Sequence, residues 1–231
     1  MDGKEEKKGR EGRKKPKTEE EMNEQDEQNG LIKPQTRWVL EQSLEMRGKL
    51  LENGYPLNIS VNISPNNLRE PDFPLYVQRL MGSHHTHRGT IILEVTETSM
   101  MQDPVNSLRA LDSLHTTGIP LSIDDFGSGY SSLSYIKRLP ASEIKIDRSL
   151  ITDLASQAGD RVIVQTTIEM CHSLGYAVVA EGVESAETME LLERMGCDMI
   201  QGYILTPPLP FDDIIVWLGD YKHHERNRKL G

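Results

Sequence analysis

Short apolar runs alternate with longer amphipathic stretches along most of the chain. The short runs are bounded by glycine, proline or charged residues, which is typical of buried strands. We predict strands at residues 57–64, 90–97, 143–147, 176–184 and 198–203, and a further strand that begins at residue 121 and ends in the acids at residues 124 and 125. The longer stretches predict helices at residues 31–50, 66–81 (after Pro74), 103–117, 131–139, 160–174, 187–195 and 211–218. Strand and helix alternate, which predicts an α/β fold with a parallel sheet covered by helices.

The strand that begins at Leu121 ends in two adjacent acids, Asp124 and Asp125. Neighbouring residues on a strand point to opposite faces, so both carboxylates can serve one site only if the strand ends between them. Gly127 and Gly129 follow and permit such a bend. The segment Asp-Phe-Gly also occurs in protein kinases, but the other kinase motifs do not accompany it here.

The composition limits the class of protein. A chain of 231 residues fits one larger domain. Its net charge of −10 and pI of about 5.2 argue against binding of a nucleic-acid polymer or an anionic membrane. The two cysteines are too few for a disulfide scaffold, and no signal peptide or membrane span is visible. We therefore expect a cytoplasmic protein that does not insert into a membrane.

Both ends of the chain are rich in charged residues. Residues 1–25 contain almost no apolar side chains, so they cannot bury enough surface to offset the entropy lost on ordering. We predict a disordered tail at residues 1–25, a folded domain at residues 26–219 and a charged C-terminal tail at residues 220–231.

Polar residues recur where the predicted strands end. In parallel α/β folds the functional residues gather at the carboxyl ends of the strands. The candidates are Asn62, Glu94, Glu97, Asp124, Asp125, Lys145, Asp147, Glu181, Glu184 and Gln201. These side chains offer many oxygen ligands, one amine and no imidazole, which suits Mg²⁺ or Mn²⁺ better than zinc. Acids around two such ions are a common device for cleaving a phosphodiester bond.

Structural explanations compete with these assignments. Glu97 and Glu184 fit equally well as acids at helix N-termini, which the helix dipole favours. Asn62 and Gln201 could bond only to backbone, and Lys145 and Asp147 could form a buried ion pair. His84, His85 and His87 suggest a metal, but they stand among glycines and fit a surface loop better.

Six stretches of the chain, in this order, resemble the EAL-domain family of cyclic-di-GMP phosphodiesterases. They are Ser60-Val61-Asn62-Ile63-Ser64, Leu93-Glu94-Val95-Thr96-Glu97, Asp124-Asp125-Phe126-Gly127-Ser128-Gly129, Glu143-Ile144-Lys145-Ile146-Asp147, Ala180-Glu181-Gly182-Val183-Glu184 and Gln201-Gly202-Tyr203. The resemblance implies a modified TIM (β/α) barrel that hydrolyses cyclic-di-GMP to the linear dinucleotide.

The resemblance also implies a role for each candidate. A first metal would be held by Asn62, Glu94 and Asp124, and a second by Asp124, Asp125 and Asp147. Lys145 would orient the attacking water, and Glu181 would act as the general base. Gln201 would line the site, Glu97 would anchor the loop after Asp125, and Glu184 would support the site or substrate. That loop also shapes the dimer interface of the family, so a homodimer is possible.

The chain departs from the family at its beginning. The Glu-Ala-Leu motif, which supplies a metal-binding glutamate, is absent, and only six of the eight strands of a closed barrel are evident. We therefore expect an N-terminally truncated, incomplete barrel with weak or no phosphodiesterase activity. The alternative is a non-catalytic module that binds cyclic-di-GMP or a protein partner.

Overall fold

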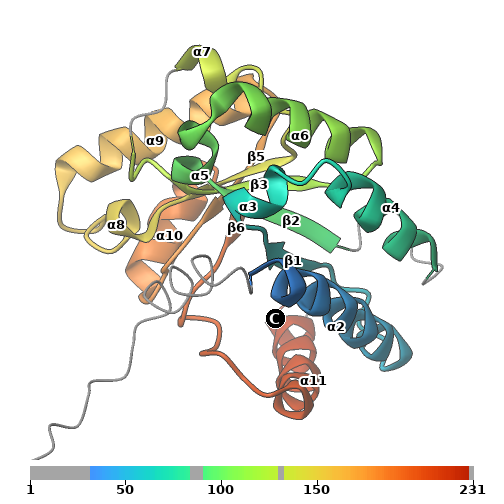
Figure 1. Cartoon of the computed structure of the whole chain (residues 1–231). Coiled ribbons are helices and arrows are strands. Elements are labelled where there is room, and N and C mark those ends of the chain that lie inside the picture. The colour runs from blue at the N-terminus through green and yellow to red at the C-terminus, as the bar shows by residue number, and fades with distance from the viewer. Residues whose placement is uncertain (1–31, 84–90, 130–132, 229–231) are drawn as a thin grey trace, which may run out of the picture.

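The computed structural model describes residues 32–83, 91–129 and 133–228. Its six strands are β1 (Ile59–Asn62), β2 (Ile91–Thr96), β3 (Leu121–Phe126), β4 (Glu143–Ile146), β5 (Ala177–Ala180) and β6 (Met199–Ile200). Each strand pairs in parallel with the next one along the chain, so β1 and β6 form the edges of the sheet. The predicted α/β class and parallel sheet are confirmed, and the sheet curves as an open half of a barrel (Figure 1).

Helices connect the strands and lie mainly around the outside of the sheet (Figure 1). They are α2 (Ile32–Glu52), α3 (Pro65–Leu68), α4 (Phe73–Ser83), α5 (Glu97–Gln102), α6 (Pro104–Thr116), α7 (Leu133–Ile136), α8 (Arg148–Ile151), α9 (Ala158–Ser173), α10 (Ala186–Met195) and α11 (Phe211–Arg228). The helix expected after Pro74 is confirmed as α4, and the short helix α3 before it was not predicted. A capping box between Ser64 and Asn67 starts α3, and Pro71 follows its end.

The two faces of the sheet differ in character. On β4, Ile144 and Ile146 are fully buried under the helices, whereas Lys145 points to the inner, concave face. The same alternation runs through the other strands, which bury Val61, Leu93, Val95, Leu121, Ile123 and Val178 in the apolar core. This core fixes the register of the strands, because a slip by one residue would turn every polar side chain into it.

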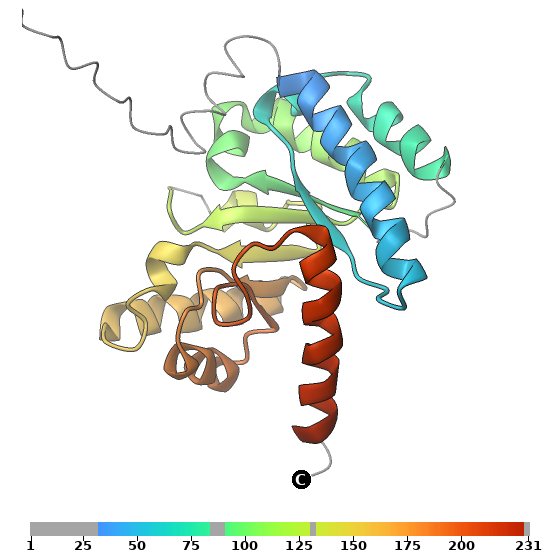
Figure 2. The ribbon, with the colours of Figure 1, turned by 90° about the horizontal axis from the view of Figure 1, so that it is seen from below.

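The last helix is longer than the sequence predicted. We expected a helix over residues 211–218 and a charged tail from residue 220, but α11 continues to Arg228. The stacked rings of Trp217 and Tyr221 lie one turn apart across the expected end, and the following residues include good helix formers. The start of α11 lies near the end of α2, where Lys49 Nζ stands 5.8 Å from the centre of the Phe211 ring. Figure 2 shows how α11 stands apart from the helices on the outer face.

Some predictions fall outside the described residues. The tail at residues 1–25 and the histidines at 84, 85 and 87 are among them, and their interpretations stay predictions. Among the helices that the structure does describe, none combines the length and apolar character needed to cross a membrane.

A buried hydroxyl ties β5 to the chain that leads into β4. The Tyr176 side chain is 7% exposed, and its Oη lies 2.8 Å from the carbonyl oxygen of Ile136 and 3.0 Å from that of Leu139. We expect Tyr176→Phe to lower the free energy of unfolding by about 1–3 kcal/mol, because both carbonyl groups lose the tyrosine donor, while that of Ile136 keeps the Leu139 N–H at 3.1 Å. Chemical denaturation followed by circular dichroism measures this change.

The matched control is Tyr203→Phe, since Tyr203 is 64% exposed. We expect that variant to stay within about 0.5 kcal/mol of the wild type. Equal effects of the two substitutions would contradict the structural role of the Tyr176 hydroxyl.

Candidate active site

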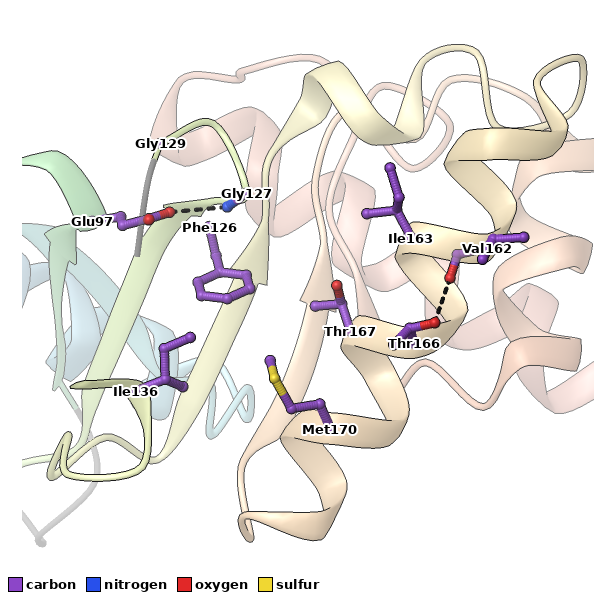
Figure 3. Close-up of a pocket in the computed structure, with 10 residues that line it drawn as sticks. All are labelled: Glu97, Phe126, Gly127, Gly129, Ile136, Val162, Ile163, Thr166, Thr167 and Met170. Carbon is purple, nitrogen blue, oxygen red and sulfur yellow. Dashed lines mark hydrogen bonds between the residues drawn. The ribbon is translucent and has the colours of Figure 1, made fainter. Parts of the chain in front are cut away.

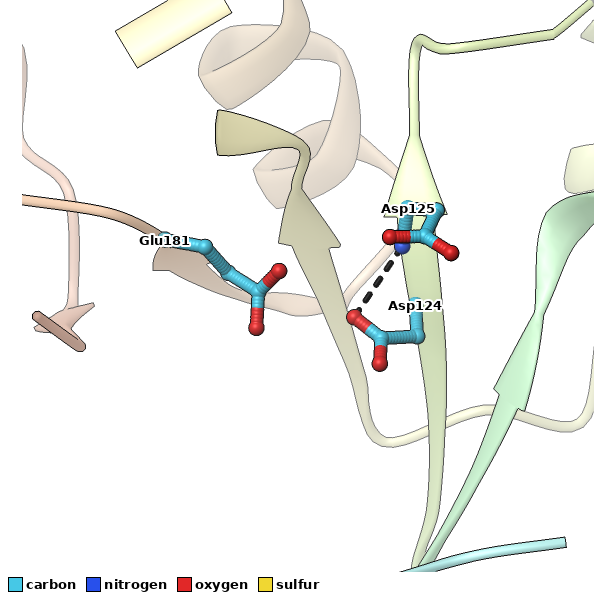
Figure 4. A group of neighbouring side chains, drawn as sticks. All are labelled: Asp124, Asp125 and Glu181. Atoms are coloured by element: carbon cyan, nitrogen blue, oxygen red, sulfur yellow. Dashed lines mark hydrogen bonds between the residues drawn. The ribbon is translucent and has the colours of Figure 1, made fainter. Parts of the chain in front are cut away.

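The end of β3 brings two adjacent aspartates to one side of the sheet. Asp125 has a φ of 57°, in the left-handed region, and the pairing of β3 with β4 shifts between Ile123 and Phe126. Carboxylate oxygens of Asp124, Asp125 and Glu181 all lie within 4.8 Å of one another (Figure 4). Contrary to our expectation, the strand does not end between the two aspartates, because β3 continues to Phe126. The backbone instead changes direction within the strand at Asp125, and again at Gly127, whose φ is 97°.

A buried lysine stands among the acids. Lys145 Nζ lies 2.6 Å from Glu181 Oε1 and 3.2 Å from both Glu94 Oε1 and Asp124 Oδ1. Burial by itself would lower the pKa of Lys145, but the three carboxylates outweigh it and raise that pKa above its ordinary value. The ammonium group therefore stays charged and links β2, β3, β4 and the residue after β5.

Burial has the opposite effect on the pKa of Glu181, which lies beside this lysine. It raises the pKa of Glu181 above its ordinary value, although the hydrogen bond from Lys145 opposes the change. A carboxylate with a raised pKa is a better proton acceptor, which suits a general base.

The remaining inner-face candidates surround this cluster. Asn62 is paired by strand register with Glu94. Gln201 lines a cavity of about 370 Å³ together with Glu94 and Lys145. Glu143 lines the same cavity and was not among our candidates. The sequence contained a signal for Glu143, because residues two apart on a strand point to the same face of the sheet and Glu143 stands two residues before Lys145.

Glu97 holds the loop that follows the two aspartates. Its side chain is buried in the first turn of α5, so Glu97 begins a helix and does not end a strand as we expected. Its Oε2 accepts a hydrogen bond of 3.0 Å from the Gly127 backbone N–H. Figure 3 shows this bond at the edge of a mostly apolar cavity of about 390 Å³, between the loop and α9. A side chain at Gly129 would also approach the Glu97 carboxylate, to 3.4 Å.

Two candidates make other contacts. The Asp147 carboxylate caps α8, where it accepts hydrogen bonds from the backbone N–H and the hydroxyl of Ser149. Glu184 is exposed and forms an ion pair of 3.1 Å with Arg148. Neither belongs to the group of three close carboxylates. Their roles in metal binding and site support stay predictions.

The donor set fits a hard divalent cation. Asp124 and Asp125 at the end of β3 and Glu181 after β5 present oxygen atoms at mutual distances that one ion can span. Asn62 and Glu94 add further oxygen atoms from β1 and β2. An ion with oxygen ligands and octahedral geometry, as Mg²⁺ or Mn²⁺ has, matches these side chains.

A family model described as the EAL domain matches residues 15–208. The chain belongs to the EAL domain family. The match begins inside the segment that we predict to be a tail, and that segment lies outside the described residues.

Relatives and solved structures agree with this assignment. The chain is 40% identical over 190 residues to MucR of Pseudomonas aeruginosa, described as a bifunctional diguanylate cyclase/cyclic di-GMP phosphodiesterase. It is 34% identical over 174 residues to the cyclic di-GMP phosphodiesterase RocR of the same organism. These matches cover 82% and 75% of this chain, but only 28% of MucR and 44% of RocR.

Two solved EAL structures share the fold. The MucR phosphodiesterase in complex with c-di-GMP superposes with a TM-score of 0.80 and 38% identity, over 85% of this chain and 80% of that one. The EAL domain of Mycobacterium smegmatis DcpA gives a TM-score of 0.75 and 35% identity, over 81% and 84%. The predicted modified TIM barrel is thereby confirmed, with six strands in the described part of the chain.

The left-handed conformation of Asp125 yields a test of the site's backbone. Asn tolerates a positive φ better than Ala does, and both substitutions remove the same charge. We expect Asp125→Asn to be more stable than Asp125→Ala by about 1 kcal/mol, measured by chemical denaturation.

The same pair of substitutions at Asp112 serves as the control. Asp112 is exposed within α6, where Ala is the better helix former, so Asp112→Ala should be the more stable of the two. If Ala were also preferred at Asp125, the strained conformation would be contradicted.

Proposed function

We propose that this EAL domain binds cyclic-di-GMP with Mg²⁺ or Mn²⁺ and hydrolyses one of its phosphodiester bonds, at a low rate. Supporting observations are the 40% identity to MucR and the convergence of Glu94, Asp124 and Glu181 on one lysine. The convergence carries the proposal, since it places acids and a cation at the strand ends where a phosphate can be held.

Each side chain then has a defined task. Asn62, Glu94 and Asp124 would hold one metal ion. Asp124, Asp125 and Asp147 would hold the second. Bound ions would lower the pKa of a coordinated water and neutralise charge on the phosphate. Gln201 and Glu184 would line or support the substrate site, and Glu97 would keep the loop after Asp125 in place through Gly127.

Proton transfer falls to Glu181 and Lys145. Glu181 accepts a proton from the water as its oxygen attacks phosphorus, and the bond from phosphorus to one bridging ribose oxygen breaks. Lys145, which pairs with Glu181 at 2.6 Å in the metal-free structure, would orient that water once the metal ions are bound. The leaving ribose oxygen takes up a proton from solvent water, which completes the linear dinucleotide.

We propose a low turnover because this sequence has fewer metal-binding carboxylates than the family pattern. The family's Glu-Ala-Leu motif would add one carboxylate, and no such motif stands in this sequence. A shift of about 1 Å in a positioned group can reduce turnover on the order of a hundredfold. We propose that the chain acts in the cytoplasm, where its substrate is a small dinucleotide rather than a nucleic-acid polymer, and that it can form a homodimer.

The decisive experiment incubates the protein with cyclic-di-GMP and Mn²⁺ and follows the nucleotide by chromatography. We expect linear dinucleotide to form about a hundredfold more slowly than with the MucR phosphodiesterase domain. Glu181→Ala should abolish it, whereas Glu190→Ala, at an exposed helix position, should not.

The outcomes separate the alternatives. Turnover that survives in Glu181→Ala would indicate a contaminating hydrolase or a different base. Binding of cyclic-di-GMP without any product would favour a non-catalytic binding module. If the protein neither bound nor hydrolysed cyclic-di-GMP, both the enzymatic and the nucleotide-binding proposals would be contradicted. A role in protein interaction would then remain.

A further inference from the structure

We propose that Lys145 is the built-in counter-ion of the metal-free site, and that a divalent cation must displace its ammonium group to bind. This inference rests on the metal-binding part of the proposed function. It concerns how the chain's own residues compete with the ion, and it does not require turnover.

The geometry places the ammonium group where a metal would have to stand. One nitrogen atom lies within 3.2 Å of oxygen atoms from Glu94, Asp124 and Glu181. Two of these acids, Glu94 and Asp124, are the carboxylates proposed to hold the first metal ion, which needs their oxygen atoms at about 2.0–2.6 Å. The ammonium and the ion cannot share these positions, and their like charges repel at such distances.

Burial makes the lysine necessary while no metal is bound. The side chains of Lys145 and Glu94 are 4% and 8% exposed. Carboxylates removed from water in this way destabilise a fold unless they are paired. The lysine therefore stabilises the empty acidic site, and that stabilisation opposes metal binding.

The lysine also has room to withdraw. Its side chain lines the cavity of about 370 Å³ on the inner face of the sheet, together with Ser60 and Gln201. A lysine side chain has four rotatable methylene groups, so the ammonium can leave the acids without movement of β4. The exchange of lysine for metal is thus a side-chain rearrangement within a fixed barrel wall.

The test compares Lys145→Met with wild type in two measurements. Isothermal titration with MnCl₂ should show about tenfold or tighter binding by the variant, because the competing charge has gone. Thermal denaturation in EDTA should show a lower melting temperature for the variant, and Mn²⁺ should raise that temperature more than it does for wild type.

Two further variants serve as controls. Lys145→Arg keeps the positive charge and should resemble wild type in both measurements. Arg148→Met removes one positive charge at the rim, where Arg148 pairs with Glu184 and not with the three buried acids. It should leave Mn²⁺ affinity within about twofold of wild type, since exposed charges are screened.

Every outcome decides the matter. Equal or weaker Mn²⁺ binding by Lys145→Met overturns the inference while leaving the metal site intact. A variant that is unfolded in EDTA but folds on addition of Mn²⁺ supports it, and one that stays unfolded in millimolar Mn²⁺ overturns it. Failure of wild type and all variants to bind Mn²⁺ overturns the metal site and the inference together.

Discussion

The contact of Lys145 with Glu94, Asp124 and Glu181 is the interaction on which the inner face of the sheet depends. The acids come from β2, from β3 and from the residue after β5, and the lysine stands on β4 between them. Without a cation at this point, buried carboxylates would repel one another across neighbouring strands. The same cation is an obstacle to any metal that needs those oxygen atoms. Stability without metal and affinity for metal are therefore opposed in this site.

The apolar outer face makes this concentration of charge tolerable. Buried Leu93, Ile123 and Ile144 alternate with Glu94, Asp124 and Lys145 along their strands, so each polar residue is fixed by its apolar neighbours. A register slip would exchange the two sets and bury the charges among the helices. The core thus supports the site by specifying where each carboxylate can lie.

Much of this arrangement could be predicted from the sequence because it is periodic. Alternation within strands placed Lys145 opposite Ile144, and acids after apolar runs marked the carboxyl ends of the strands. What sequence could not provide was conformation at single residues. The left-handed φ of Asp125, the capping of α8 by Asp147 and the pairing of Glu184 with Arg148 depend on local geometry that no residue pattern encodes. Glu143 was not predicted as a site residue, although the alternation along its strand places it on the same face as Lys145.

The loop after Asp125 connects the acid cluster to the outer surface. Glu97 accepts a hydrogen bond from the Gly127 backbone N–H, and Gly127 lies two residues after Asp125, whose backbone is in the left-handed region. Because Glu97 is 1% exposed and begins α5, a displacement of that helix would be transmitted to the loop through one hydrogen bond. The apolar cavity beside the loop leaves space on the α9 side for such a shift. The position of the loop beside Asp124 and Asp125 thus depends on a contact with α5, outside the acid cluster itself.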